Sequence, residues 1–403
     1  MLPVLVLDGT ERSALAIVRS IGRRNIRVRV GSRSHPCLAS ASRHCAATVV
    51  HRDPYIDPDG FREDILAASP PDCGEWILPC TDATTMLLVS DPRFANRLFA
   101  PSAESYETLT DKARLLRWAT EAGILVPETV IVRAPDEVRP AAESVGRPIV
   151  VKPSRSKYLH QGRIRSTAVS IAETPDEAHR VLDASDWFPA IPALVQRFVP
   201  GTGAGVFALF WDGMPVCWFS HRRLLERPPW GGVSVLSESS EVVPSLSKPA
   251  ARLLLGAAWS GLAMIEYRVT ADGTPYLMEV NGRPWGSLQL AVDCGVDFPW
   301  LYYCCAQGLP FDRPNGYSPG RRLHWTLGDL DRLLQLLRGR PLAHQSTSRL
   351  HHLSAFAATT LRHLHRSEVL RLSDPGPGIF EVLLWLSDLR RSRALGVGAR
   401  HSA

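Results

Sequence analysis

The first hundred residues alternate between short apolar runs and amphipathic stretches, a pattern typical of strands and helices in turn. Residues 4–7 form an apolar run of the kind found in buried strands, and residues 12–22 have helical periodicity. Two further apolar runs follow at 27–30 and 76–78. This alternation predicts a parallel α/β sheet over residues 1–105, in which ligands contact the carboxyl ends of the strands.

Asp82 lies just after one of these runs and is a candidate for such a contact. It either touches a substrate or caps the helix that follows. The turn after the first run lacks the spaced glycines of a dinucleotide-binding loop. An NAD-linked enzyme is therefore the weaker interpretation of this sheet.

Residues 265–283 carry the densest polar signal in the chain. Two β-rich runs flank a polar turn there, which predicts a hairpin. Glu266 lies in the first run, Glu279 in the second and Asn281 at its end. Because Glu279 and Asn281 are two residues apart, they point to one face of the strand. Their oxygens suit Mg²⁺, which shares its ligands with phosphates. The alternative is a solvated hairpin with outward polar side chains.

A strong preference for arginine sets the few lysines apart. The chain has 42 Arg and only 4 Lys. Lys112 opens an amphipathic helix and Lys152 ends an apolar strand. We expect both to bind phosphate, which suits a compact ammonium group. Lys157 and Lys248 are expected to be ordinary surface lysines.

Several short motifs occur in an order that resembles one known family. Lys112 ends a Thr-Asp-Lys motif, and Lys152 lies in Val-Lys-Pro at the end of a strand. Residues 194–201 resemble a hinge strand that binds adenine, and residues 278–283 read Met-Glu-Val-Asn-Gly-Arg. In this order and spacing the motifs resemble the ATP-grasp superfamily, and within it the carboxylate–amine ligase type. The similarity spans roughly residues 1–310.

The resemblance implies an α/β fold of the α+β ATP-grasp kind, with ATP clamped between two subdomains. The chain would then have four parts, which are an N-terminal pre-ATP-grasp α/β domain, two ATP-grasp subdomains and a basic, helical C-terminal extension. Their expected bounds are 1–105, 106–189, 190–310 and 311–403.

The resemblance also assigns roles to individual residues. The residues expected to contact ATP are Lys112, Lys152, Gln196, Arg197, Phe198, Val199 and Met278. Those expected to hold Mg²⁺, or Mn²⁺ in its place, are Glu266, Glu279 and Asn281. Arg283 and Lys152 are the expected catalytic residues. The candidate substrate contacts are Asp82, Arg222, Arg223 and Arg283.

The implied reaction activates a carboxylate as an acyl phosphate and joins it to an amine, with release of ADP and phosphate. A carboxylase or another acceptor of the phosphoryl group is the alternative within the same fold. A non-catalytic nucleotide-binding module is the alternative of another class. Small-molecule carboxylates and amines are the expected partners, nucleic acid is not expected, and a homodimer is compatible with the resemblance.

Two segments depart from the family pattern. Residues 154–158, which follow Lys152, contain no glycine, although relatives place a glycine-rich loop there. Residues 201–205, after the hinge, contain no acidic residue for the ribose. Trp230 and the two glycines after it, preceded by Arg222 and Arg223, form a second candidate lid.

The C-terminal part differs in charge from the rest of the chain. From Arg321 to the end there are 13 Arg, no Lys and 6 acidic residues, whereas the whole chain has a net charge of +6. Helices packed on the core, binding of an acidic partner, and contact of residues 379–393 with an anionic membrane surface remain open for this part. Scattered cysteines, and the absence of a recognisable secretory or membrane segment in this sequence, predict a cytoplasmic protein.

Overall fold

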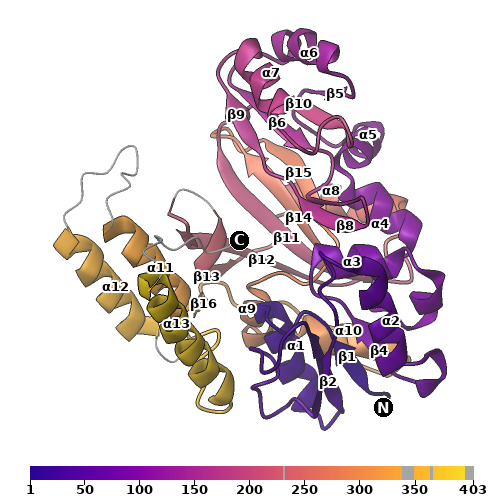
Figure 1. Ribbon diagram of the computed structural model, residues 1–403, viewed down its shortest axis with the longest axis vertical. Helices are drawn as coiled ribbons and strands as arrows, with labels where there is room; N and C mark the ends of the chain where they lie inside the picture. Colours follow the sequence, from indigo (N-terminus) through magenta and orange to yellow (C-terminus); the bar gives the residue numbers. More distant parts are fainter. Residues whose placement is uncertain (230–231, 338–348, 364–365, 395–403) are drawn as a thin grey trace.

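The computed structural model describes residues 1–229, 232–337, 349–363 and 366–394 (Figure 1). It contains three main sheets and a separate two-stranded hairpin. The predicted parallel sheet is present at the N-terminus, with the strand order β3-β2-β1-β4 and parallel pairing throughout. Its strands are β1 (Val4–Val6), β2 (Val28–Ser32), β3 (Ala47–Val50) and β4 (Trp76–Leu78). The helices of this part are α1 (Arg12–Gly22), α2 (Pro58–Ala68), α3 (Asp82–Val89) and α4 (Ala103–Thr110).

The second sheet is smaller and antiparallel, with the strand order β5-β10-β6-β9. Its strands are β5 (Thr129–Val132), β6 (Ile149–Pro153), β9 (Ser170–Ala172) and β10 (Ala193–Arg197). Three helices accompany it, α5 (Lys112–Glu121), α6 (Val138–Val145) and α7 (Pro175–Asp183). The hairpin of β7 (Lys157–His160) and β8 (Arg163–Ser166) leaves this sheet between β6 and β9.

The third sheet has six antiparallel strands in the order β15-β14-β11-β12-β13-β16. Its strands are β11 (Thr202–Trp211), β12 (Met214–Arg227), β13 (Val233–Ser240), β14 (Gly261–Val269), β15 (Pro275–Asn281) and β16 (Arg322–His324). The helices around it are α8 (Pro244–Gly256), α9 (Leu288–Asp293) and α10 (Phe298–Gln307). Strand β16 comes from the part of the chain expected to be an extension, so that part contributes to the central sheet.

Alternation along β11 places its side chains in two cores, one on each face of the large sheet. Val206 and Phe210 pack into a core with Leu253 of α8. Phe207, on the opposite face, packs into a larger core that includes Val30 of the N-terminal sheet. Because successive side chains of a strand point to opposite faces, one strand contributes to two cores. The large sheet is thereby fixed to the N-terminal domain.

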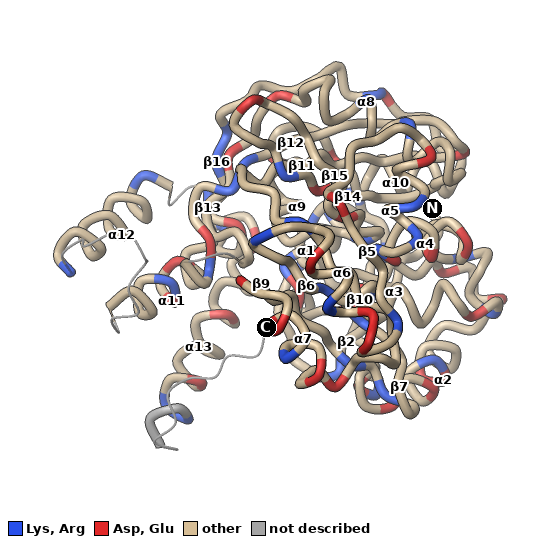
Figure 2. The backbone as a smooth tube through the Cα atoms, turned by 90° about the horizontal axis from the view of Figure 1, so that it is seen from above, with Lys and Arg blue, Asp and Glu red and all other residues tan. Residues whose placement is uncertain are grey.

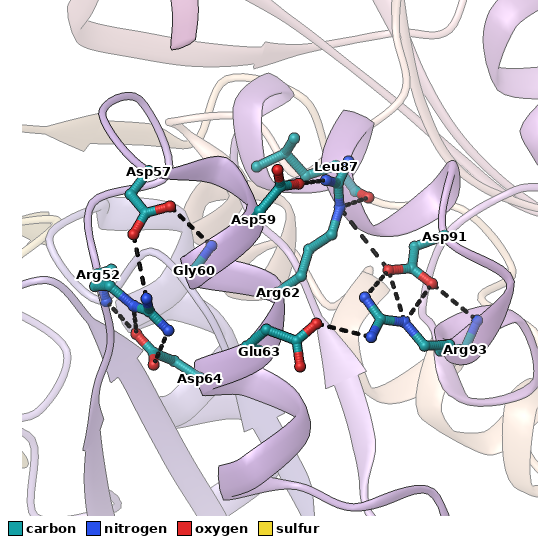
Figure 3. A network of polar contacts seen from close by, with 10 residues as sticks. All are labelled: Arg52, Asp57, Asp59, Gly60, Arg62, Glu63, Asp64, Leu87, Asp91 and Arg93. Atoms are coloured by element: carbon teal, nitrogen blue, oxygen red, sulfur yellow. Dashed lines mark hydrogen bonds and ion pairs between the residues drawn. The ribbon is translucent and has the colours of Figure 1, made fainter. Parts of the chain in front are cut away.

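Arginine–carboxylate pairs tie α2 to the segments beside it (Figure 3). Arg52 forms two bonds to Asp64, at 2.8 and 3.0 Å, and Arg93 bonds Glu63 at 2.8 Å. The hydrogen bond from Arg52 lowers the pKa of Asp64. These groups lie at the surface, where a single pair contributes little stability, so they fix orientation more than they stabilise the fold.

Three helices follow the large sheet, α11 (Thr326–Leu337), α12 (Arg349–His363) and α13 (Gly376–Ala394). They gather on one side of the molecule in both views (Figures 1 and 2). The prediction of helices in this part is confirmed. Of the leucines at helical spacing in α11, Leu333 is the buried one. Among the described residues, no helix is long and apolar enough to cross a membrane.

Arg19 of α1 anchors the segment that precedes α13. Its guanidinium bonds Asp374 at 2.8 Å and donates to the carbonyls of Glu368 and Val369 at 2.9 and 2.8 Å. Both charged groups are buried, since the side chains of Arg19 and Asp374 are 9% and 3% exposed. Removing one partner of such a pair leaves the other charge buried and unpaired.

We therefore expect Arg19→Met to lower the free energy of unfolding by about 3 kcal/mol. Arg139→Met is the matched control, because Arg139 and its partner Asp176 are 60% and 72% exposed. The control substitution should lower the free energy of unfolding by less than about 1 kcal/mol. Urea unfolding followed by tryptophan fluorescence measures both, and equal effects of the two substitutions would contradict the anchoring role of Arg19.

Candidate functional site

A cleft lies between the second sheet and the large sheet, and it encloses about 480 Å³. Both lysines singled out in the sequence line it, together with both glutamates of the β14–β15 hairpin. The other lining residues named in the sequence analysis are Gln196, Arg197, Phe198, Val199, Arg223 and Met278. The strands thus bring together groups that are as much as 167 positions apart in the sequence.

Lys112 is held by the start of α5. Asp111 caps this helix by accepting hydrogen bonds from the backbone amides of Ala113 and Arg114 at 2.9 and 3.2 Å. The Lys112 ammonium donates to Ser156 Oγ at 3.0 Å and lies 3.2 Å from Glu279 Oε2. Its side chain is 9% exposed, so the position of this charge is well defined.

Lys152 lies on β6 and is 5% exposed. Burial, and then the positive charge of Lys112, lower the pKa of Lys152 to about 8, although Glu279 acts in the opposite direction. Two buried ammonium groups close to each other favour a ligand that carries several negative charges. Polyphosphate is such a ligand.

The two glutamates face each other across the β14–β15 hairpin, because Glu266 pairs with Glu279 in the register. Asn281 donates to Glu266 Oε1 at 3.1 Å and to Glu279 Oε1 at 3.4 Å. Arg223 of β12 lies 3.3 Å from Glu266 Oε2. Each carboxylate is therefore paired with one cation, Glu279 with Lys112 and Glu266 with Arg223.

The surroundings move the pKa values of the two carboxyl groups in opposite directions. Burial, and then repulsion from Glu279, raise the pKa of Glu266. Burial also acts to raise the pKa of Glu279, but Lys112, with help from Lys152 and Asn281, outweighs it and lowers this pKa. Glu279 is therefore the one of the two carboxyl groups that keeps its negative charge to lower pH.

The donor set fits Mg²⁺. Two carboxylates and one amide converge, and Mg²⁺ in proteins is commonly held by one or two carboxylates together with substrate phosphates. Turning the Asn281 amide by half a turn would point its oxygen where its nitrogen now lies. Glu266, Glu279 and Asn281 are thus the residues that would hold the ion, as expected from the sequence.

A smaller cavity of about 40 Å³ adjoins this site. Its lining residues are Asp82, Met86, Tyr106, Thr110, Lys112, Arg155, Ser156, Lys157, Glu279, Val280 and Asn281. Arg283 follows β15, and its Nε lies 2.9 Å from Asp82 Oδ1. The expectation that Asp82 would otherwise cap α3 is wrong, because Thr81 is the cap and accepts from the amide of Thr84 at 3.3 Å. Asp82 instead holds Arg283 at the edge of the site.

Lys157 was missed by the sequence analysis, which treated it as a surface lysine. It lines the small cavity, donates to Ser166 Oγ at 2.6 Å and lies 5.2 Å from the centre of the Tyr55 ring. Burial lowers its pKa. The signal that could have found Lys157 is the scarcity of lysine in an arginine-rich chain, which also singled out Lys112 and Lys152.

The segment after Lys152, which has no glycine-rich loop, folds as the β7–β8 hairpin. Gln161 and Gly162 form its turn with φ values of 49° and 71°, the left-handed pair that a tight hairpin requires. The amide of Ile164 donates to the carbonyl of Tyr55 at 3.0 Å, and the Ile164 side chain is buried in the core around Leu5 and Leu7. The hairpin is therefore docked on the N-terminal domain and covers the small cavity.

The hinge residues line the far end of the large cleft. Gln196 is fully buried and donates to Thr129 Oγ1 at 2.7 Å, while its own Oε1 is buried without a hydrogen-bond partner. Arg197 points outward and lies 3.7 Å from Glu128. Met278 lines the cleft, whereas its neighbour Leu277 is buried in the core below. A flat apolar ring would contact Met278 in this position.

The side chains of Arg222 and Arg223 point in different directions, because the two residues are neighbours on one strand. Arg222 Nε bonds Glu238 Oε1 at 2.9 Å, so it is turned toward β13 and does not line the cleft. Arg223 lines the cleft and a third cavity of about 280 Å³.

His221 lies in that third cavity, bonded to Ser287 at 2.7 Å. Burial, and then the charge of Arg223, lower the pKa of His221 to about 3. The candidate lid residue Trp230 lies outside the described residues.

A protein-family model matches residues 191–325, and its description reads "ATP-grasp in the biosynthetic pathway with Ter operon". The carbamoyl phosphate synthase large chain of Thermotoga neapolitana is 27% identical over 196 residues. The match covers 46% of this chain and 17% of that protein. The chain therefore spans about a sixth of the length of such relatives.

Solved structures share the fold across most of the chain. Biotin carboxylase from Campylobacter jejuni superposes with a TM-score of 0.63 at 13% identity and covers 80% of this chain and 74% of its own. An ADP complex of N5-carboxyaminoimidazole ribonucleotide synthetase has a TM-score of 0.63 at 14% identity, with coverage of 91% and 98%. L-amino acid ligase from Bacillus licheniformis has a TM-score of 0.59 at 14% identity, with coverage of 80% and 78%.

These likenesses confirm the α/β ATP-grasp fold that the sequence predicted. The family model spans residues 191–325, which carry the hinge, the paired glutamates and Asn281. The chain is thus similar to ATP-grasp proteins in fold and, over residues 191–325, to one ATP-grasp family model.

Proposed function

We propose that the protein is an ATP-dependent ligase that joins a carboxylate to an amine. One observation carries the proposal. Two carboxylates and an amide lie beside two buried lysines at the junction of two sheets, which is a site for the phosphates of ATP and its metal. The similarity to ATP-grasp proteins supports it, since carbamoyl phosphate synthase and L-amino acid ligase are among the relatives and structural neighbours.

In this proposal the nucleotide lies in the large cleft. Lys112 and Lys152 bind its phosphates, the backbone of residues 196–199 meets the edge of its base, and Met278 contacts the face of that base. Glu266, Glu279 and Asn281 would hold Mg²⁺, which when bound would neutralise charge on the phosphoryl group being transferred. The two lysines position the phosphates through charge, since phosphoryl transfer depends mainly on positioning and electrostatics.

The chemistry has two steps. An oxygen of the substrate carboxylate attacks the γ-phosphorus, the bond to the ADP oxygen breaks, and an acyl phosphate forms. The amine nitrogen then attacks the acyl carbon, inorganic phosphate leaves and the nitrogen loses a proton. Arg283, held by Asp82 at the small cavity, stabilises the negative charge on the acyl oxygen in the second step. Arg223, at the third cavity, binds an anionic group of a substrate.

The size of the small cavity favours a second candidate function, activation of bicarbonate. About 40 Å³ holds roughly three water molecules, a size that suits a small planar anion beside Lys112, Arg155 and Lys157 better than a bulky carboxylate. Measuring ADP release with bicarbonate as the sole acceptor, against pools of organic carboxylates and amines, separates the two functions. Release that needs both an organic carboxylate and an amine would rule out the second candidate.

Glu279→Gln tests the site directly. We expect ADP release with Mg²⁺ to fall about a hundredfold or more, because the change removes the more firmly charged ligand of the ion. The fold should persist, which far-ultraviolet circular dichroism checks. Glu121→Gln, an exposed glutamate at the end of α5, should retain full activity. A fully active Glu279→Gln protein would contradict the metal assignment.

The lowered pKa of Lys152 predicts a pH dependence of nucleotide binding. The ammonium form binds phosphate, and it is present below a pH of about 8 and lost above it. Affinity for ADP should therefore weaken as the pH rises through 8. Lys152→Arg keeps its charge throughout this range, so its affinity should not change with pH there. Isothermal titration at several pH values measures both, and a pH dependence unchanged in the variant would contradict the role of Lys152.

The ion pair between Arg223 and Glu266 predicts competition with the metal. Arg223→Gln should raise the affinity for Mn²⁺, in the absence of nucleotide, about three- to fivefold, because the pair is partly exposed and weak. Arg222→Gln is the matched control, since Arg222 is bonded to Glu238 instead. Electron paramagnetic resonance of free Mn²⁺ measures the effect. Equal Mn²⁺ affinities of the two variants would count against competition at Glu266.

A further inference from the structure

Exposed apolar residues concentrate in the helices that follow the large sheet. In the described part of the chain, 22 large hydrophobic residues are exposed, and ten of them lie between residues 350 and 386. This segment is a small share of the chain, so scattered single exposures, which are normal on a surface, do not account for it. They are Leu350, Leu353, Leu361, Leu370, Leu372, Ile379, Val382, Leu383, Leu384 and Leu386.

Four of these residues form one stripe along α13. Ile379, Val382, Leu383 and Leu386 have helical spacing, and they are 57%, 42%, 62% and 41% exposed. Arg390 continues the same stripe at the end of the helix and is exposed. This face of α13 is therefore an apolar strip that ends in a positive charge.

The other face of α13 is occupied by the protein itself. Phe380 packs against the large core, although its apolar character had suggested a surface contact. Glu381 accepts a hydrogen bond from Trp325 Nε1 at 2.7 Å, and Trp385 donates to Asp331 at 2.8 Å. These contacts fix the rotation of the helix, so the apolar stripe faces outward as a consequence of packing.

Charge is distributed over this region in a one-sided way. In described residues 349–391, no acidic residue is exposed, since Glu368 and Asp374 are buried and Glu381 and Asp388 are half-buried. The exposed charged residues there are Arg349, Arg362, Arg390 and Arg391. The outer surface of α12 and α13 is thus apolar and positive, and both helices lie on the same side of the molecule (Figures 1 and 2).

We propose that the outer face of α13, with its apolar stripe and the arginines at its end, binds an anionic lipid membrane. A helix that lies in a membrane interface combines an apolar stripe with arginine, and acidic headgroups attract the arginines. A second copy of the chain fits less well, because it would bring two positive surfaces together. Nucleic acid would complement the charge but would leave the apolar stripe exposed.

The rest of the protein holds this surface in place. Arg19 bonds Asp374, Arg12 bonds Glu368, and Arg371 bonds Asp293 at 2.6 Å. The segment leading to α13 is thereby attached to α1 and α9. The membrane surface does not depend on the proposed catalytic function, since none of its residues lines the nucleotide cleft.

Sedimentation with lipid vesicles tests the proposal on the full chain. The protein should bind vesicles that contain phosphatidylglycerol, bind vesicles of phosphatidylcholine alone at least about tenfold more weakly, and dissociate as salt is added. Replacing Arg390 and Arg391 together by Gln should weaken binding about thirtyfold, since each arginine contributes near an anionic surface.

Leu383→Asp combined with Leu386→Asp should abolish binding to the anionic vesicles. Met214→Asp is the matched control, because Met214 is 57% exposed at the start of β12, and this variant should bind normally. Unchanged nucleotide affinity in all variants shows that the fold is intact. Absence of binding by the unaltered protein would overturn the proposal. So would a dimer, seen by analytical ultracentrifugation, that the leucine substitutions dissociate without any binding to vesicles.

Discussion

The pairing of two carboxylates with two cations is the interaction on which the candidate site depends. Glu266 and Glu279 face each other across one hairpin, where their repulsion would be costly without compensation. Lys112 and Arg223 supply that compensation from two different elements, α5 and β12. A cluster of this kind is balanced without ligand. In the proposed function, a metal ion would replace the cations at the carboxylates and phosphates would attract the same cations.

The surrounding fold serves to hold these groups at one place. Strand β11 packs on two cores, so the large sheet cannot shift relative to the N-terminal domain without disturbing both. The second sheet brings Lys152 to the cleft, and the β7–β8 hairpin brings Lys157 over the small cavity. The hairpin is also attached to the N-terminal domain through Ile164 and Tyr55. The small cavity is therefore covered where two folded parts of the chain contact each other. The chain lacks a glycine-rich loop at this point.

The C-terminal part of the chain combines two properties that sequence composition alone does not separate. Its buried acids and Phe380 attach it to the core, as Asp374 does through Arg19. Its arginines at 390 and 391 and its outward leucines remain exposed. The excess of arginine in this part is therefore exposed at the surface, because several of its acids are buried while arginines such as Arg390 and Arg391 are exposed.

Local pattern by itself determined the parallel sheet, the helix that begins at Lys112 and the hairpin that carries Glu266, Glu279 and Asn281, because strand and helix periodicity and turn residues act over a few positions. Tertiary structure alone decided the rest. It placed Asp82 against Arg283, which is 201 positions away, and Lys157 in a cavity instead of on the surface. It also turned Arg223 into the cleft and Arg222 out of it, since the orientation of a strand depends on which of its faces is buried. Such contacts join distant segments, and no local periodicity encodes which of them will meet.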